Sequence, residues 1–186
     1  MIKPHPRQAI FPVITLATCL LLLISQAVYG STHLHQPITF KAGSSPTIDG
    51  QVHVSFPQSI KQWETLINAA AQETGLDPNL IASVMLQESG GQPQVISASG
   101  AVGLMQVMPR DGTAASFTCI NGPCFQNRPS ISELTDPEFN IFYGSRFLAD
   151  LISRYDSIRS ALRAYGPMDV GFSYADKVLA IFNTHP

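Results

Sequence analysis

The chain has 186 residues, with 11 basic and 13 acidic side chains and a formal net charge of −2. This length favours one domain with a hydrophobic core of its own. The net acidity excludes a sequence-independent nucleic-acid-binding protein, because contacts to phosphates require clustered lysine and arginine side chains.

The first 30 residues have the order of a secretory signal peptide. Lys3 and Arg7 form a basic start, residues 13–24 form an apolar run, and small residues follow at Ala27 and Gly30. We expect cleavage after Gly30 or Ala27 and export from the cytoplasm. An uncleaved membrane anchor is the alternative, although the run of about 12 residues is shorter than the ~20 that span a bilayer.

The three cysteines have different predicted roles. Cys19 ends a stretch that loosely resembles a lipobox, so a lipoprotein is a less favoured alternative. Cys119 and Cys124 flank an Asn-Gly-Pro turn, and in an oxidising compartment we expect them to form a disulfide. A metal half-site is the alternative, but the sequence offers no second cysteine pair or nearby histidine. The sequence also contains no His-Glu-x-x-His or Gly-x-Gly-x-x-Gly pattern, and we expect no metal and no other cofactor.

The region after the signal peptide divides into a lead-in and a domain. Residues 31–57 are mixed in composition and are predicted to be a linker or N-terminal extension, and residues 58–186 are predicted to be the domain. Helical periodicity begins at Ser59, which stands at capping-box spacing from Gln62. Gly75 is predicted to end this first helix.

The remaining elements are predicted to be mostly helical. Asp77 and Pro78 indicate the N-cap and first residue of a helix that Gly90 ends. Residues 92–110 predict a turn or hairpin with a short helix, and residues 111–134 predict a polar insertion. Three further helices are predicted at 136–155, 157–165 and 172–182. The predicted fold class is mainly α, with one small irregular or β-hairpin segment near 92–110.

Glu88 is the most informative residue of the second helix. It continues the apolar stripe of Ile81, Val84 and Met85, because these positions share one helix face. A carboxyl group on that face loses water, which raises its pKa, and the negative end of the helix dipole acts in the same direction. A carboxyl group that is neutral near pH 7 can act as a general acid. The alternative is a marginal glutamate that reaches solvent or pairs with an arginine.

The motifs around Glu88 resemble those of the soluble-type lytic transglycosylases, which share the goose-type lysozyme fold. Residues 88–90 (Glu-Ser-Gly) resemble the catalytic Glu-Ser motif of that family. Residues 103–106 (Gly-Leu-Met-Gln) resemble its second motif, and 18 residues separate the glutamate from the glutamine. The segments 136–148 and 174–178 resemble two later blocks. The resemblance covers residues 60–182 and implies a lysozyme-like α+β fold.

The resemblance also implies a set of site residues, with Glu88 as the general acid and base. Five other residues would bind substrate or lie beside the catalytic carboxyl: Ser89, Ser97, Gln106, Met108 and Tyr165. Packing or helix capping is the alternative for each of them. The family usually reads Ala-Tyr-Asn-x-Gly-Pro, whereas this chain reads Tyr165-Gly166-Pro167 and lacks the asparagine.

The sequence offers no convincing second catalytic carboxylate. Asp77 is a predicted N-cap, Glu73 lies in the last turn of a helix, and Asp111 begins another segment. A single carboxylate suits a substrate that supplies its own nucleophile. The resemblance implies a periplasmic enzyme that cleaves the MurNAc-β-1,4-GlcNAc bond of peptidoglycan and forms 1,6-anhydromuramic acid. A goose-type lysozyme and a non-catalytic peptidoglycan-binding or secretion-assembly protein are the alternatives.

The resemblance also gives expectations about partners. Peptidoglycan glycan strands are the expected substrate, and nucleic acid is not expected as a ligand. Small exported relatives serve secretion, pilus or conjugation machines, so one of these is an expected partner. We expect the protein to act as a monomer.

Overall fold

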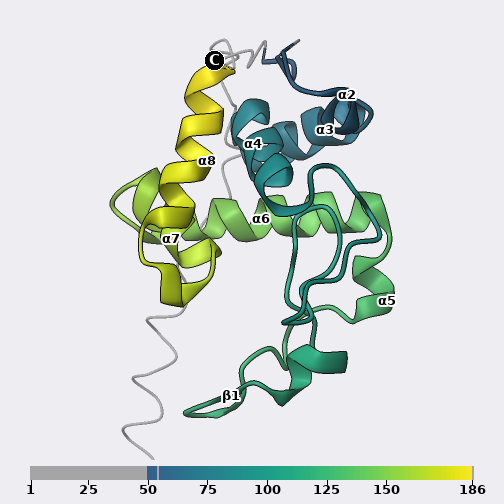
Figure 1. Ribbon diagram of the computed structural model, residues 1–186, viewed down its shortest axis with the longest axis vertical. Helices are drawn as coiled ribbons and strands as arrows, with labels where there is room; N and C mark the ends of the chain where they lie inside the picture. The colour runs from purple at the N-terminus through teal and green to yellow at the C-terminus, as the bar shows by residue number, and fades with distance from the viewer. Residues whose placement is uncertain (1–49, 54, 186) are drawn as a thin grey trace, which may run out of the picture. The chain divides into compact units, whose positions relative to one another are not determined.

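The structure, a computed structural model, describes residues 50–53 and 55–185 (Figure 1). The predicted signal peptide, its cleavage sites and Cys19 lie outside these residues, as does most of the predicted linker. Within the described part of the chain, no helix has the length and apolarity needed to cross a membrane. Val52 and Phe56, at the end of the predicted linker, are 2% and 3% exposed and belong to the core.

The first predicted helix is divided into two. Helix α2 covers Gln58–Lys61 and helix α3 covers Glu64–Thr74. The break occurs at Trp63, whose backbone leaves the helical region while its indole N–H donates a hydrogen bond to the Gly91 carbonyl at 3.0 Å. The predicted capping box is absent, because the side chain of Gln62 donates to the Ser59 carbonyl instead.

Helix α4 covers Pro78–Ser89, and its predicted ends are confirmed. The Asp77 side chain accepts a hydrogen bond from the Asn79 N–H at 2.8 Å, as an N-cap does. Gly90 follows the helix with a φ of 61°, and Gly75 ends α3 in the same way with a φ of 73°. Both glycines adopt the left-handed conformation that terminates helices.

The segment 92–110 is irregular, as predicted, but it contains no helix. Its backbone forms two isolated antiparallel bridges, which join Val102 to Ile96 and to Val107. The predicted short helix is therefore wrong. Residues 101–105 are nonetheless all buried, so this segment contributes to the core although it lacks regular structure.

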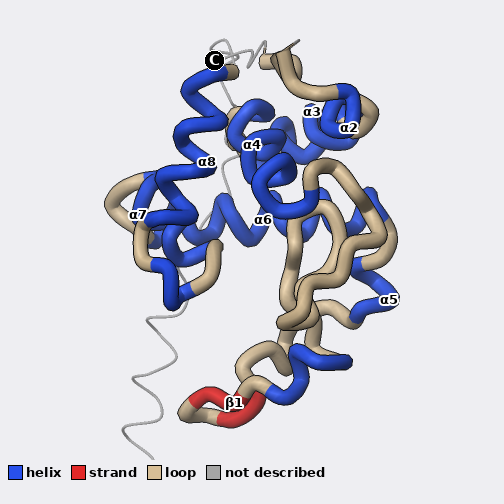
Figure 2. Tube along the Cα trace, viewed as in Figure 1, coloured by secondary structure: helices blue, strands red, loops and turns tan. Residues whose placement is uncertain are grey.

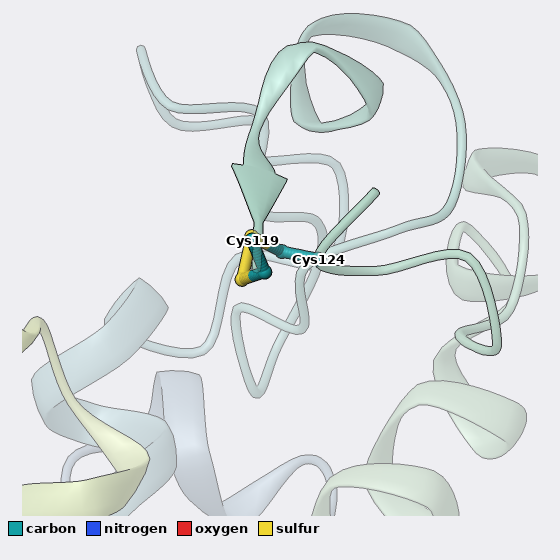
Figure 3. Close-up of a disulfide and its surroundings, with 2 residues drawn as sticks. All are labelled: Cys119 and Cys124. Carbon is teal, nitrogen blue, oxygen red and sulfur yellow. A yellow bond between two sulfur atoms is a disulfide. The ribbon is translucent and has the colours of Figure 1, made fainter. Parts of the chain in front are cut away.

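The insertion 111–134 contains the two-stranded sheet of the described residues. A 3₁₀ turn at Gly112–Ser116 precedes strand β1, Thr118–Cys119, which pairs antiparallel with β2, Gly122–Pro123. Helix α5, Ile131–Leu134, ends the insertion. The disulfide predicted between Cys119 and Cys124 is present, with an S–S distance of 2.08 Å (Figure 3).

Three longer helices complete the domain close to their predicted positions (Figure 2). They are α6 at Pro137–Arg154, α7 at Ile158–Tyr165 and α8 at Ser173–Thr184, and a 3₁₀ turn at Met168–Val170 precedes α8. Helix α6 packs against α3 and α7, and α8 packs against α4 and α7. The predicted mainly α fold class is confirmed. The packing places the end of α4 against α8, which builds the candidate site.

Candidate active site

Glu88 lies in the last turn of α4 and is half-buried. The rest of its helix face, Ile81, Val84 and Met85, is fully buried. Desolvation by burial raises the pKa of the Glu88 carboxyl group to about 7. The Tyr174 hydroxyl acts in the opposite direction, because it donates a hydrogen bond to Oε1 at 2.5 Å and thereby favours the charged form.

Tyr174 is a site residue that the sequence did not single out. It lies in the first turn of α8 and is 6% exposed. Burial and the nearby Glu88 charge raise its pKa well above the usual tyrosine value, so its hydroxyl stays protonated and can donate. Tyr174 shares an inward helix face with Val178, and this spacing was the signal that could have indicated a buried tyrosine.

Gly166 makes room for Tyr174. A Cβ atom at position 166 would lie only 2.4 Å from the Tyr174 ring, so a side chain there would displace the ring. The sequence Tyr165-Gly166-Pro167, which lacks the asparagine of the related motif, thus places a glycine where the ring of Tyr174 approaches the backbone. This close approach gives a physical reason for glycine at this position in the chain.

Tyr165 lies beside the site, but unlike Tyr174 it does not donate to Glu88. Its hydroxyl donates to the Met105 carbonyl at 2.8 Å. Burial raises its pKa well above the usual value, and the charge of Glu88 adds to that effect, so the two side chains are within electrostatic reach. Gly144 of α6 permits this contact, because a Cβ there would lie 3.2 Å from the Tyr165 hydroxyl oxygen and 2.5 Å from the Met105 Cβ.

Ser89 connects the end of α4 to the irregular segment. Its buried hydroxyl lies 2.8 Å from the Leu104 carbonyl and 3.2 Å from the Met85 carbonyl, and it accepts from the Gly91 N–H at 3.1 Å. These contacts occupy the hydroxyl within the protein and fix residue 104 beside helix α4. Substrate binding by Ser89 stays a prediction.

Gln106, Ser97 and Met108 lie in the same irregular segment. The Gln106 amide donates to the carbonyls of Val95 and Gly103 at 3.1 and 3.0 Å, while the Gln106 backbone adopts a positive φ of 46°. The Ser97 hydroxyl accepts from the Ala101 N–H at 3.0 Å. All three side chains are half-buried, and their roles toward substrate stay predictions.

Asn140 of α6 binds the backbone of this segment. In the sequence it was noted only as part of the segment 136–148, which resembles a block of the family. Its buried Oδ1 accepts from the Met105 N–H at 2.8 Å, and its Nδ2 donates to the Val102 and Leu134 carbonyls at 2.9 Å. Gly103 passes so close that a Cβ would lie 2.4 Å from that Nδ2. Asn140 thus supplies a partner for the buried Met105 N–H and an additional donor for two buried backbone carbonyls.

The acids considered as a second catalytic carboxylate have other contacts. Glu73 pairs with Arg146, and Asp77 caps the opposite end of α4 from Glu88. The Asp111 side chain accepts from the Ile131 N–H at 2.8 Å. In the described part of the chain, no group of three or more histidine, cysteine, aspartate or glutamate side chains could hold a metal ion.

Comparison with known families identifies the class of this domain. The transglycosylase SLT domain family matches residues 65–173, which is more than half of the chain. The chain therefore belongs to this family. The match includes Glu88, the segment 103–106 and Tyr165, and it ends one residue before Tyr174.

Individual relatives carry related names. The chain is 36% identical over 106 residues to "Membrane-bound lytic murein transglycosylase E" of Buchnera aphidicola, covering 57% of this chain and 47% of the relative. It is 40% identical over 90 residues to "Endo-type membrane-bound lytic murein transglycosylase A" of Klebsiella pneumoniae, covering 48% and 43%. It is 37% identical over 107 residues to "Transglycosylase" of Enterobacteria phage PRD1, covering 58% and 35%. The alignments thus span less than half of each of these relatives.

A solved structure shows the same fold. An inactive variant of lytic transglycosylase Slt from Pseudomonas aeruginosa superposes with a TM-score of 0.52 and 23% sequence identity. The superposition covers 70% of this chain and 24% of that protein. This likeness confirms the lysozyme-like helical fold expected from the motifs.

Proposed function

We propose that this protein is a peptidoglycan lytic transglycosylase that uses Glu88 as its single acid and base. The observation that carries the proposal is a half-buried carboxyl group whose pKa is raised to about 7 and whose Oε1 is held by Tyr174. Membership of the transglycosylase SLT domain family and the names of the relatives support this activity. The substrate bond would be the β-1,4 linkage from N-acetylmuramic acid to N-acetylglucosamine.

The first step uses Glu88 as an acid. Tyr174 occupies Oε1, while Oε2 has no hydrogen-bond partner among the described residues and is available to carry the proton. The neutral carboxyl group donates that proton to the glycosidic oxygen as the bond from C1 breaks. The hydrogen bond from Tyr174 favours the carboxylate that this transfer leaves behind.

The second step uses the same carboxylate as a base. It takes the proton of the C6 hydroxyl of the muramoyl residue, and that oxygen attacks C1. One bond to C1 breaks and one forms, Glu88 recovers its proton, and no water is consumed. The product is 1,6-anhydromuramic acid. The other contacts of Glu73, Asp77 and Asp111 are consistent with a one-carboxylate site.

Product analysis of digested cell walls tests the reaction. Purified peptidoglycan is incubated with the wild type and with Glu88→Gln, and the masses of the released muropeptides are measured by mass spectrometry. We expect anhydro products from the wild type and a rate lower by about 10²–10⁴-fold for the variant. Products heavier by one water would identify a lysozyme-like hydrolase. Equal rates for both proteins would remove Glu88 from the mechanism.

One observation favours a second candidate function. The chain lacks the asparagine that follows the tyrosine in the related motif, as a non-catalytic peptidoglycan-binding or secretion-assembly protein could. If this candidate is correct, the wild-type protein will sediment with cell walls in the digestion experiment but release no muropeptides. Sedimentation with release of anhydro products would exclude this candidate.

We further propose that the protein is exported and acts in the periplasm as a monomer. The order of residues 1–30 and the Cys119–Cys124 disulfide support export, because disulfides persist in oxidising compartments. A secretion, pilus or conjugation machine is the proposed partner. Cell fractionation with N-terminal sequencing tests export, and a mature protein that begins at Ser31 or Val28 is the expected result. A full-length cytoplasmic protein would contradict the proposal.

A further inference from the structure

A positive charge lies on the aromatic cluster beside the candidate site. Arg128 comes from the end of the insertion, and its guanidinium carbon lies 3.9 Å from the ring centroid of Phe147 on α6. The Phe147 ring packs against Tyr165 with centroids 5.4 Å apart, and Tyr165 donates to the Met105 carbonyl. The insertion therefore brings a cation to the cluster that adjoins residues 103–106.

Arg128 has no acidic partner in the described part of the chain. Four other arginines there form ion pairs with nearby acids: Arg110, Arg146, Arg154 and Arg159. The Arg128 guanidinium donates no hydrogen bond to a described residue, and its side chain is half-buried. A guanidinium group that is partly desolvated and presents free donors is well suited to bind an anion.

The backbone around Arg128 is held in place. Its N–H donates to the Phe125 carbonyl at 2.9 Å, and its carbonyl accepts from the Arg110 side chain at 3.2 Å. The Arg110 N–H also donates to the neighbouring Pro129 carbonyl at 2.9 Å. Because these bonds and the ring of Phe147 order the residue in advance, binding an anion would cost little conformational entropy.

The charges of Arg128 and Glu88 act on the same hydroxyl group. Burial and the Glu88 charge raise the pKa of Tyr165, whereas the Arg128 charge opposes that increase. Both charges therefore lie within electrostatic reach of Tyr165. The packing of Arg128 on Phe147 and of Phe147 on Tyr165 gives the same proximity, so an anion bound by Arg128 would lie near the region of Glu88.

We propose that Arg128 determines specificity by binding a carboxylate carried on the lactyl arm of the muramoyl residue. This inference rests on the proposed function. The hydroxyl and N-acetyl groups of the glycan are neutral, so the carboxylates are found on the lactyl arm. They belong to the attached stem peptide or, where the peptide has been removed, to the lactyl group itself. The guanidinium fork matches a carboxylate in two parallel hydrogen bonds.

Binding to three glycan probes tests this assignment in an inactive background. Calorimetric titration compares Glu88→Gln with the double variant Glu88→Gln/Arg128→Gln. The probes are a glycan fragment with stem peptides, the same fragment stripped to free lactyl groups, and a neutral chitooligosaccharide. We expect the double variant to bind a carboxylate-bearing probe about tenfold more weakly and the neutral probe equally well. The probe that responds identifies the source of the carboxylate.

Two outcomes would overturn the inference: unchanged binding of both carboxylate-bearing probes, or an equal loss for the neutral probe. Arg163→Gln is the matched control, because Arg163 also lies over an aromatic ring, 4.9 Å from the Phe172 centroid, and has no ion-pair partner among the described residues. It should leave all three affinities unchanged. Arg128→Lys should recover part of the loss, and thermal unfolding checks that each variant is folded.

The two proposals fail separately. Because affinity is measured in an inactive background, a wild type that releases no products would contradict the proposed function and leave the binding result intact. A wild type that releases anhydro products, combined with binding that does not depend on Arg128, would contradict this inference alone.

Discussion

Two irregular segments of the domain are stabilised in opposite ways. Residues 92–110 lie between α4 and α6, and Val102, Leu104 and Met105 within them are at most 1% exposed. Residues 111–130 are mostly exposed, and Ile120 in their hairpin is fully exposed. The first segment is held by side-chain hydrogen bonds from helices, and the second is closed by a disulfide.

The difference follows from the needs of the backbone. A buried N–H or C=O group without a partner is costly, so an irregular segment can be buried only where side chains supply the missing hydrogen bonds. Ser89 and Asn140 do so for residues 102–105. An exposed segment is solvated by water, and a crosslink stabilises it by restricting its unfolded conformations. The arrangement of side chains at the candidate site therefore depends on the buried segment.

The substitution Gly103→Ala in the buried segment should have the largest effect on stability. Its φ of 76° disfavours a side chain, and the new Cβ would lie 2.4 Å from the Asn140 amide nitrogen. We expect the free energy of unfolding to fall by about 4 kcal/mol in urea denaturation, because the clash adds to the strain of the left-handed backbone. Gly75→Ala is the matched control, since its φ is 73° but its Cβ would meet nothing within 4 Å.

The control should lose only about 1–2 kcal/mol, the cost of the left-handed conformation for alanine. Equal losses for Gly103→Ala and Gly75→Ala would show that the close approach to Asn140 does not constrain the segment.

Removal of the Asn140 side chain should be the next largest effect. Asn140→Ala removes the partner of the Met105 N–H and one donor each from the Val102 and Leu134 carbonyls, although the Val102 carbonyl keeps the Val107 N–H. We expect a loss of about 3 kcal/mol in urea denaturation, because buried polar groups would be left unsatisfied. Asn183→Ala, on the exposed side of α8, should change stability by less than about 0.5 kcal/mol. A small loss for Asn140→Ala would mean that water replaces its hydrogen bonds.

Glu88, in the helix that precedes the buried segment, and Glu133, in the helix that follows the exposed one, should give pH effects of opposite sign. The pKa of Glu88 is raised to about 7, so the unfolded chain loses this proton at lower pH than the folded protein does. The free energy of unfolding of the wild type should therefore decrease as the pH rises from 4.5 to 7. We expect a decrease of about 2 kcal/mol for this half-buried group. Glu88→Gln should lack this decline in urea titrations across that range.

Glu133, in the helix that ends the insertion, provides the comparison. Hydrogen bonds from the Ser130 backbone and hydroxyl lower its pKa. Its contribution to stability should be present above the unfolded pKa and lost as the pH falls through the folded pKa. The difference between the wild type and Glu133→Gln should thus shrink in acid. A wild-type decline between pH 4.5 and 7 that persists in Glu88→Gln would assign it to another group.

Opening the disulfide should have the smallest effect. Cys119→Ser/Cys124→Ser releases only a short exposed loop, and we expect a loss of about 1 kcal/mol with little change in product release from peptidoglycan. Proteolysis near Ile120 should become faster, which limited digestion and mass spectrometry would detect. A loss as large as that of Gly103→Ala would mean that the insertion supports the buried segment.

The sequence predicted most of the fold because the ends of helices are determined by neighbouring residues. Asp77, Gly90 and Asp136 marked ends that the structure confirms, since capping groups act within one turn. The break between α2 and α3 was missed. It depends on a hydrogen bond from Trp63 to Gly91, a residue distant in the sequence, which local periodicity cannot indicate.

Some features of the candidate site could likewise be predicted from local sequence, and others depend on residues that are distant in the chain. The sequence by itself determined that Glu88 lies on the buried face of its helix and that Cys119 and Cys124 can pair, because periodicity and spacing are local properties. Only the tertiary structure decided that Tyr174 donates to Glu88 and that Gly166 admits its ring. The physical reason is that the packing of the chain brings Tyr174 to Glu88 across 86 residues and to the Gly166 backbone across eight.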